Sequence, residues 1–152
     1  MKIATLCYVM KDDHTLMLHR VKKDNDYHEG KWNGLGGKFE PGESPFDCAV
    51  REVREESGLT MLNPVLKGFI TFPLFDGMDD WHVFVFIAKE YSGNIIDSPE
   101  GNLEWIANDK LTDLNLWEGD KIFIKWLFKD AFFCAKFIYQ NGNYISHEVI
   151  FQ

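Results

Sequence analysis

Three glutamates, Glu52, Glu55 and Glu56, have the residue type and the spacing to hold a metal ion. In a helix of 3.6 residues per turn, positions i, i+3 and i+4 share one face, so the three carboxylates point the same way. Like charges on one face repel each other, and a bound cation offsets that repulsion. Oxygen ligands select a hard ion, so the spacing predicts Mg²⁺, with Mn²⁺ as a substitute. The alternative is a solvated acidic face, which most charge runs are.

The helix that must carry these glutamates is predicted over residues 45–57. Ser44 is a natural N-cap, Pro45 suits the first helical position, and Gly58 stands where a left-handed C-terminal cap is expected. The apolar residues on an adjoining face are predicted to pack inward, namely Phe46, Ala49, Val50 and Val53. The same helix therefore serves both the core and the chemistry.

Residues 34–37 hold three glycines in four positions, which lets the backbone approach a ligand closely. From residue 37 to 59 the chain follows the pattern G-x5-E-x7-R-E-U-x-E-E-x-G-U, where U is aliphatic. Seven positions demand one residue type each, so a chance match is on the order of 10⁻⁹ per starting position. That figure favours a functional site over an acidic surface. The stretch resembles the Nudix box, the signature of pyrophosphohydrolases acting on a nucleoside diphosphate linked to another group.

The resemblance implies a set of metal ligands. Glu52 and Glu56 are the first ligands, Glu55 is another, and the backbone carbonyl of Gly36 contributes. Glu100 matches a family position that reaches the metal, either as a ligand or to help activate water. The implied cofactor is therefore Mg²⁺, bound by oxygen atoms alone.

Further residues of the box have implied roles in catalysis and in holding the loop. Arg51 orients a box glutamate by bidentate pairing, whereas Glu43 holds the loop to the helix. Gly37 and Lys38 lie near the substrate phosphates. Water attacks a phosphoryl phosphorus, and the products are a nucleoside monophosphate and pyrophosphate.

Residues outside the box resemble the MutT-homologue branch, which hydrolyses oxidised purine nucleoside triphosphates such as 8-oxo-dGTP and so cleans the nucleotide pool. Asn33 is implied to bond the purine edge, and Trp117 to stack on the base, with Phe72 as a second wall. Asp120 is implied to accept from the base or to share a proton with it. The chain departs from the family at Gly119, where the family places a second carboxylate.

Other interpretations stay open for these residues and for the activity. Trp117 is also typical of a core aromatic, Asn33 of a turn, and Asp120 of the first turn of a helix. The same box could serve a sugar nucleotide, a dinucleoside polyphosphate or an isoprenoid diphosphate. A non-catalytic nucleotide-binding regulator is a further alternative, but such modules are expected to lose box carboxylates, and all are present.

Length and charge limit the remaining function classes. The 152 residues predict one domain, 1–152, and the net charge of -8 disfavours a nucleic acid polymer as partner. The small-molecule nucleotide is the expected partner, for a monomer or a dimer. Cys7, Cys48 and Cys134 are read as reduced packing residues of a cytoplasmic protein. The short apolar run 3–10 is not a signal peptide, and no run is long enough for a membrane span.

Strands dominate the remaining pattern, with two helices, so the sequence predicts an α/β (α+β) fold. The resemblance adds the Nudix alpha/beta/alpha sandwich, with a mixed sheet between helices. Strand-like runs lie at 3–10, 16–20, 65–75, 81–91, 103–106, 131–139 and 144–151, a loop at 22–30 and a second helix at 117–129. The histidines without ligand-like pairing are given no role, namely His14, His28, His82 and His147.

Overall fold

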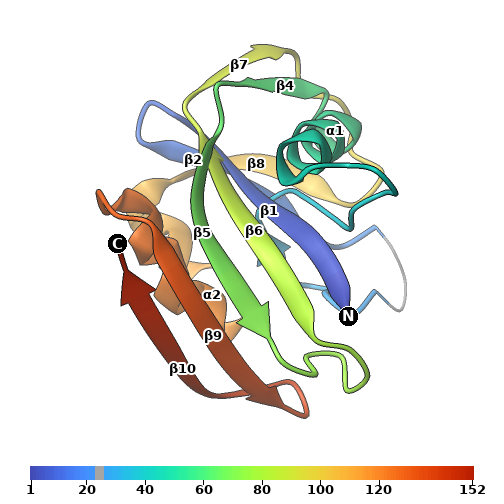
Figure 1. The fold of residues 1–152 in the computed structure, drawn as a ribbon. Helices are drawn as coiled ribbons and strands as arrows, with labels where there is room; N and C mark the ends of the chain where they lie inside the picture. Colours follow the sequence, from blue (N-terminus) through green and yellow to red (C-terminus); the bar gives the residue numbers. More distant parts are fainter. Residues whose placement is uncertain (23–25) are drawn as a thin grey trace.

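The computed structural model describes residues 1–22 and 26–152, and its strands build a large mixed sheet (Figure 1). The strands of this sheet are β1 (Lys2–Lys11), β2 (His14–His19), β3 (Trp32–Asn33), β5 (Val65–Phe72), β6 (Trp81–Ala88), β8 (Asn102–Ala107), β9 (Phe133–Gln140) and β10 (Asn143–Phe151). Their order is β10, β9, β5, β6, β1, β2, β3, with β8 beside β2. The pairs β1–β6 and β5–β9 are parallel and the others are antiparallel.

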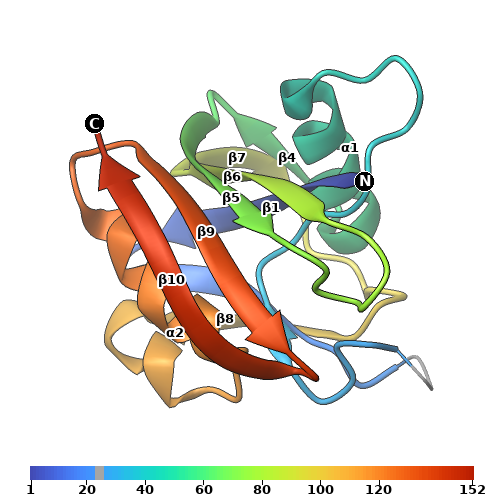
Figure 2. The same ribbon diagram turned by 60° about the horizontal axis from the view of Figure 1, so that its bottom comes forward.

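Helices and a small ribbon complete the fold. The helices are α1 (Pro45–Ser57) and α2 (Glu118–Phe123), with 3-10 turns at Asn108–Asp113 and Ile124–Phe128. A separate two-stranded ribbon pairs β4 (Leu59–Leu62) with β7 (Glu90–Gly93). Figure 2 shows the hairpin of β9 and β10 running in front of α2, and α2 contacts β10.

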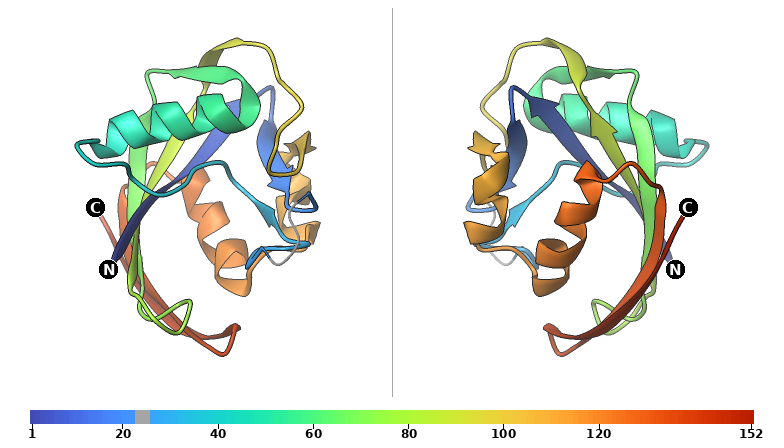
Figure 3. Two further views of the ribbon diagram at one scale, coloured as in Figure 1. Left: turned by 90° about the vertical axis from the view of Figure 1, so that its right-hand side faces the viewer. Right: turned by 90° about the vertical axis from the view of Figure 1, so that its left-hand side faces the viewer.

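The sheet has a hydrophobic core on each face, because successive residues of a strand point to opposite sides. From β1, Tyr8 packs in one cluster with Phe123 of α2, whereas its neighbour Cys7 packs in another with Ala49 and Val53 of α1. The sheet therefore lies between the two helices (Figure 3). This arrangement confirms the predicted mixed α/β fold with a sheet between helices.

Helix α1 begins and ends where its caps predict. The Ser44 side chain accepts from the Asp47 amide, and the Asp47 side chain accepts from the Ser44 amide, each at 3.0 Å. This reciprocal pair is a capping box. At the other end Gly58 adopts φ 80, and its amide donates to the Arg54 carbonyl. Local residue chemistry therefore sets both helix ends.

The inward face of α1 differs from the prediction at its first turn. Ala49 and Val53 are buried as predicted, and Val50 is partly buried, but Phe46 is 50% exposed. Phe46 follows the exposed loop of residues 40–42 and lies in the first turn, before the helix packs on the sheet. The prediction that Phe46 packs inward is therefore wrong.

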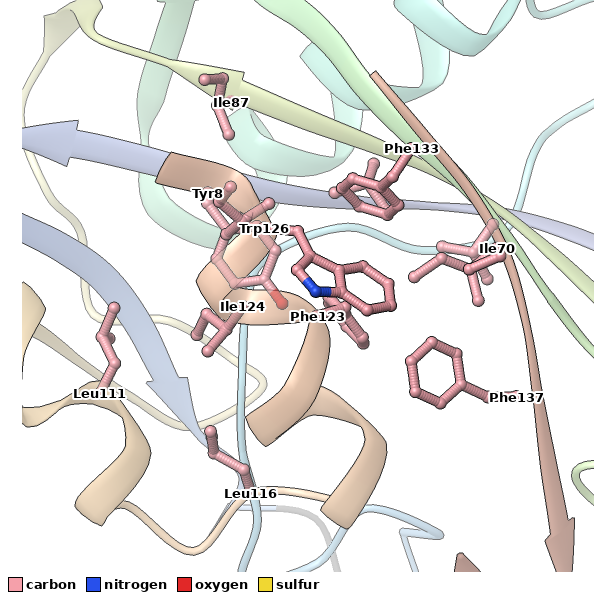
Figure 4. Close-up of a cluster of buried hydrophobic side chains, with 14 of the residues drawn as sticks. Tyr8, Ile70, Ile87, Leu111, Leu116, Phe123, Ile124, Trp126, Phe133 and Phe137 are labelled. Atoms are coloured by element: carbon pink, nitrogen blue, oxygen red, sulfur yellow. The ribbon is translucent and has the colours of Figure 1, made fainter. Parts of the chain in front are cut away.

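The predicted helix over residues 117–129 is two shorter pieces. A six-residue α-helix, α2, passes directly into the 3-10 turn Ile124–Phe128. Figure 4 shows Phe123, Ile124 and Trp126 in one cluster with Phe133 and Phe137 of β9. Ile124, Trp126 and Leu127 of this 3-10 turn are buried.

The strand predictions hold with shifted ends. The hairpin of β1 and β2 and the terminal hairpin of β9 and β10 are both present. The run 65–75 ends at Phe72, and the run 81–91 divides into β6 and β7. Residues 23–25 of the predicted loop 22–30 lie outside the described residues. The short strands β3 and β4 were not predicted.

Two further sequence predictions concern the cysteines and membrane-spanning helices. Cys7 and Cys48 are buried packing residues, but Cys134 is exposed on β9, so the packing interpretation of Cys134 is wrong. Of the helices in residues 1–22 and 26–152, none has the length and apolar character to cross a membrane.

Candidate active site

A pocket of about 490 Å³ is lined by α1, α2 and the ends of several strands. One set of lining residues consists of charged side chains and two glycines of the loop before α1, namely Arg20, Gly36, Gly37, Lys38, Glu52, Glu56 and Glu100. A second set is mostly aromatic, namely Tyr27, His28, Phe72, Phe75, Trp81 and Trp117, together with Asn33 and Asp120. One cavity thus joins a carboxylate region to an aromatic wall.

Two carboxylates of α1 contact the glycine loop that precedes the helix. The Gly36 amide donates to Oε1 of Glu56 at 2.7 Å. A Cβ added at Gly37 would lie 2.7 Å from the Glu52 carboxylate, so a side chain at position 37 would displace that carboxylate. Both glutamates line the pocket, as their spacing on the helix predicts.

Glu56 is the most buried carboxylate of this region, at 5% exposure. Burial raises its pKa to about 8; the Gly36 hydrogen bond lowers the pKa, and the charges of Glu52 and Glu100 raise it. Burial likewise raises the pKa of Glu52, against the lowering effect of Arg51. These carboxylates are therefore held close to one another at an electrostatic cost.

Arg51 connects the loop to the helix. Its guanidinium donates to Glu43 at 2.6 Å and 2.8 Å, and to Glu52 at 2.8 Å. It also donates to the carbonyl of Lys38 at 3.1 Å. The hydrogen bonds from Arg51 lower the pKa of Glu43 to about 2. Arg51 thus pairs with Glu43 through two hydrogen bonds and with Glu52 through one, so it joins the loop to the Glu52 side chain.

The structure brings together all the predicted site residues except Arg51 and Glu55, which are not among the described residues that line the pocket. The Glu55 side chain is 59% exposed and lies 3.3 Å from Arg51. Glu55 therefore faces solvent beside the pocket.

The donors of the carboxylate region match a divalent cation in chemistry. Within the described part of the chain, no group of three His, Cys, Asp or Glu side chains is arranged to bind a metal ion as it stands. Glu52, Glu56 and Glu100 nevertheless line one pocket, and the charges of Glu52 and Glu100 raise the pKa of Glu56. A hard cation relieves this repulsion once the carboxylates turn toward it, so the residues fit such an ion.

The aromatic region is built around Trp117. Its indole N–H donates to Nδ1 of His28 at 2.8 Å. The Tyr27 ring stacks on Trp117 at 5.6 Å and 16°, and Phe75 meets it edge-on at 5.0 Å. The ammonium of Lys31 lies 5.0 Å from the centre of a Trp117 ring. Trp117 is therefore held in one orientation by its neighbours.

Two polar side chains accompany this aromatic wall. Asn33 of β3 is 9% exposed and Asp120 of α2 is 8% exposed, and both line the pocket with Phe72. Burial raises the pKa of Asp120 to about 7, against a lowering effect of Lys31. The pocket therefore offers an amide and a carboxyl group beside flat rings, which suits a planar polar ligand.

Several lining residues were missed by sequence reasoning. His28, which was given no role, contacts Trp117 from 89 residues away and stays neutral, because burial lowers its pKa to about 4. Arg20 lies 2.8 Å from Asp26 and 3.5 Å from Glu100. Tyr27, Phe75 and Trp81 also line the pocket. Such contacts join separate loops, so no local pattern marks them.

Known proteins share this fold and this motif. The NUDIX domain family matches residues 1–127. An uncharacterized Nudix hydrolase of Bacillus subtilis is 36% identical over 130 residues, covering 83% of this chain and 78% of its own. The oxidized purine nucleoside triphosphate hydrolase of Mus musculus is 30% identical over 144 residues, covering 95% and 90%. The crystal structure of a mutator MutT protein from Bacillus halodurans superposes with TM-score 0.88 at 34% identity, covering 98% and 97%.

Family, fold and box agree with one another. Nudix hydrolases generally use divalent metal ions, which accords with the acidic region of the pocket. The family match includes the whole box, residues 37–59, with helix α1 and the start of strand β4. The chain therefore belongs to the Nudix family and is a Nudix hydrolase.

Proposed function

We propose that this Nudix hydrolase is a Mg²⁺-dependent pyrophosphohydrolase of purine nucleoside triphosphates, including oxidised ones such as 8-oxo-dGTP, and that it cleans the nucleotide pool. The observation that carries the proposal is the single pocket that joins Glu52 and Glu56 to Trp117, Asn33 and Asp120. A nucleoside triphosphate has the matching halves, a charged phosphate chain and a flat polar base. The mouse and zebrafish relatives named for oxidized purine nucleoside triphosphates support the same substrate class.

The phosphate chain is proposed to lie in the carboxylate region. Glu52, Glu56, Glu100 and the Gly36 carbonyl would hold the metal, which supplies a Lewis acid for the phosphoryl oxygens and for water. Arg51 keeps the Glu52 carboxylate oriented through its 2.8 Å hydrogen bond. These contacts support metal-assisted hydrolysis of a phosphoric anhydride.

The reaction is a displacement at phosphorus. Water attacks a phosphoryl phosphorus, the bond to the leaving pyrophosphate breaks, and a nucleoside monophosphate is formed. The proton lost by the water passes to a carboxylate oxygen of this region that the metal leaves unbound. The cation of Lys38, which lines the pocket, offsets phosphate charge.

The base is proposed to lie against Trp117, with Phe72 as the opposite wall. Base stacking on an aromatic ring contributes ~1–3 kcal/mol. Asn33 offers both a donor and an acceptor, and Asp120 accepts from N–H groups or shares a proton. Both polar side chains are nearly buried, so a base that leaves them unpaired loses affinity.

A substrate panel tests the proposal. We expect kcat/KM with Mg²⁺ to be highest for a purine nucleoside triphosphate, normal or oxidised, with monophosphate and pyrophosphate as products by phosphorus NMR. Preferred cleavage of sugar nucleotides or dinucleoside polyphosphates would contradict the substrate class. Nucleotide binding without pyrophosphate release would contradict catalysis.

A matched pair of variants on α1 tests the site. Glu56→Gln alters a carboxylate inside the pocket, whereas Glu55→Gln alters one that faces solvent. We expect the first change to lower turnover far more than the second. Equal losses would show that the pocket does not define the metal site.

A further inference from the structure

Helix α2 receives a hydrogen bond at its start from a distant strand. The amide of Gly119 donates to the hydroxyl of Tyr139, on β9, at 2.6 Å in a buried setting. The first amides of a helix have no partner within the helix, and a side-chain oxygen usually accepts from one of them. Trp117 stands at the N-cap, and its indole can only donate, so it cannot accept. Tyr139 supplies the missing acceptor.

Tyr139 also determines what can stand at position 119. A Cβ added to Gly119 would lie 2.7 Å from the Tyr139 hydroxyl and 2.9 Å from Cδ1 of Phe137. Figure 4 shows Phe137 pointing from β9 into the core, where it packs near Phe123 at 5.8 Å. Phe137 is fully buried and Tyr139 is 7% exposed. The hydroxyl therefore occupies the space that a side chain at 119 would need.

The same short turn carries the proposed base-reading residues. Trp117 precedes Gly119 by two positions, and Asp120 follows it directly. The Tyr139 ring meets Trp117 edge-on at 5.9 Å, so one tyrosine contacts both the backbone and the aromatic wall. Asp120 is buried, whereas the Glu118 side chain is 64% exposed and pairs with Lys121. Asp120 is thus the carboxyl group that this turn directs into the pocket.

We propose that Tyr139 is a positioning residue that determines base specificity: it holds the first turn of α2 and excludes a second acidic side chain at position 119. Asp120 then reads the base as a single carboxyl group. This inference rests on the proposed function, because it concerns the base of the same substrate.

A single carboxyl group gives a defined preference. An ionised carboxylate accepts from two adjacent N–H groups, as on the guanine edge. An adenine edge presents a ring acceptor beside an amino donor, so it needs a donor from the protein as well. Two neighbouring carboxyl groups that share one proton supply that donor readily, whereas a lone one is ionised above its pKa. Guanine-type bases are therefore expected to be favoured over adenine-type bases in neutral to alkaline solution.

Three variants test the proposal. Tyr139→Phe removes the hydroxyl and keeps the ring. Tyr144→Phe is the matched control, because the Tyr144 hydroxyl lies 2.7 Å from Nδ1 of His147, a residue of the same strand β10. Gly119→Asp with Tyr139→Phe introduces a second acid while removing the hydroxyl that opposes it. Kinetics are measured for guanine and adenine nucleoside triphosphates, normal and oxidised, and thermal melting reports folding.

We expect Tyr139→Phe to raise KM for guanine nucleotides ~3- to 10-fold, the loss of about one hydrogen bond, with a smaller change in kcat. Tyr144→Phe should leave KM unchanged, and the double variant should shift the guanine-to-adenine ratio of kcat/KM toward adenine. Equal KM for the two single variants, or an unchanged ratio in a folded double variant, would overturn the proposal. If the double variant does not melt cooperatively, the comparison of the two single variants decides. A wild-type chain that hydrolyses sugar nucleotides but no nucleoside triphosphate would instead refute the proposed function, and this inference with it.

Discussion

Replacing Asp120 by asparagine removes a buried group whose protonation makes stability depend on pH. Burial raises the pKa of Asp120 from 3.8 to about 7, against a lowering effect of Lys31. Between these values the folded chain keeps a proton that the unfolded chain has released. Stability therefore falls as pH rises through this window, and the contribution levels off above about pH 7.

The size of the effect follows from the pKa difference. A difference of ~3 pKa units corresponds to up to ~4 kcal/mol, or ~1.4 kcal/mol for each pH unit between the two values. Asparagine has nearly the same shape and does not titrate. We therefore expect Asp120→Asn to become progressively more stable than the wild type as pH rises from 4 to 7, with a constant difference above that range.

Urea unfolding at half-unit steps from pH 4 to 8 measures this difference directly. Asp76→Asn is the matched control, because hydrogen bonds from the amides of Asp79 and Met78 and from Trp81 lower the pKa of Asp76 to about 2. Its stabilising contribution is lost as pH falls toward 2, so its difference from the wild type should be constant above pH 5. An Asp120→Asn difference that stays constant within ~0.5 kcal/mol from pH 4 to 8 would refute the reasoning.

Three further substitutions probe the catalytic carboxylate, the aromatic wall and a helix cap. Glu56→Gln should lower kcat by ~10²-fold or more. Thermal melting without metal should stay unchanged, because glutamine still accepts from the Gly36 amide. Substantial residual activity would exclude Glu56 from catalysis. Trp117→Ala should raise KM for purine triphosphates ~5- to 150-fold, the equivalent of ~1–3 kcal/mol of stacking, and leave KM for a base-free pyrophosphate ester unchanged; equal effects would argue against stacking. Gly58→Ala should destabilise the fold by at least ~1–2 kcal/mol in urea unfolding, because Gly58 has φ 80 and the new Cβ would lie 2.5 Å from a backbone oxygen. Gly42→Ala, at φ 82 with open space around it, is the control, and an equal loss there would show that crowding at residue 58 is unimportant.

The limits of helix α1 could be read from the sequence because helix caps are local. Ser44 and Asp47 are three residues apart, and Gly58 adopts its left-handed conformation with the amide bonded to Arg54. The same period places Glu52 and Glu56 on one face, and both line the pocket. The exposure of Phe46 was not readable, because it depends on where the sheet ends beneath the helix.

The second helix shows where local reasoning stops. The apolar residues of the predicted helix spread around its circumference, and α2 passes into a 3-10 turn after Phe123. The side chains of this turn pack in one cluster with Phe133 and Phe137 of β9, so its conformation depends on contacts with a distant strand. Tertiary packing therefore overrides the helical pattern in this segment.

The sequence by itself determined the family, the helix that carries the carboxylates and the residue types that suit a hard cation, because the residues concerned lie in one continuous stretch, 37–59. Only the tertiary structure decided which neighbours hold the residues of the proposed base site in place. His28 contacts Trp117 across 89 residues, and Tyr139 bonds the amide of Gly119 across 20. Such contacts exist only after separate strands and loops have met, so spacing alone cannot encode them. Local spacing within the box therefore specifies the chemistry, whereas long-range packing outside it specifies the shape of the base site.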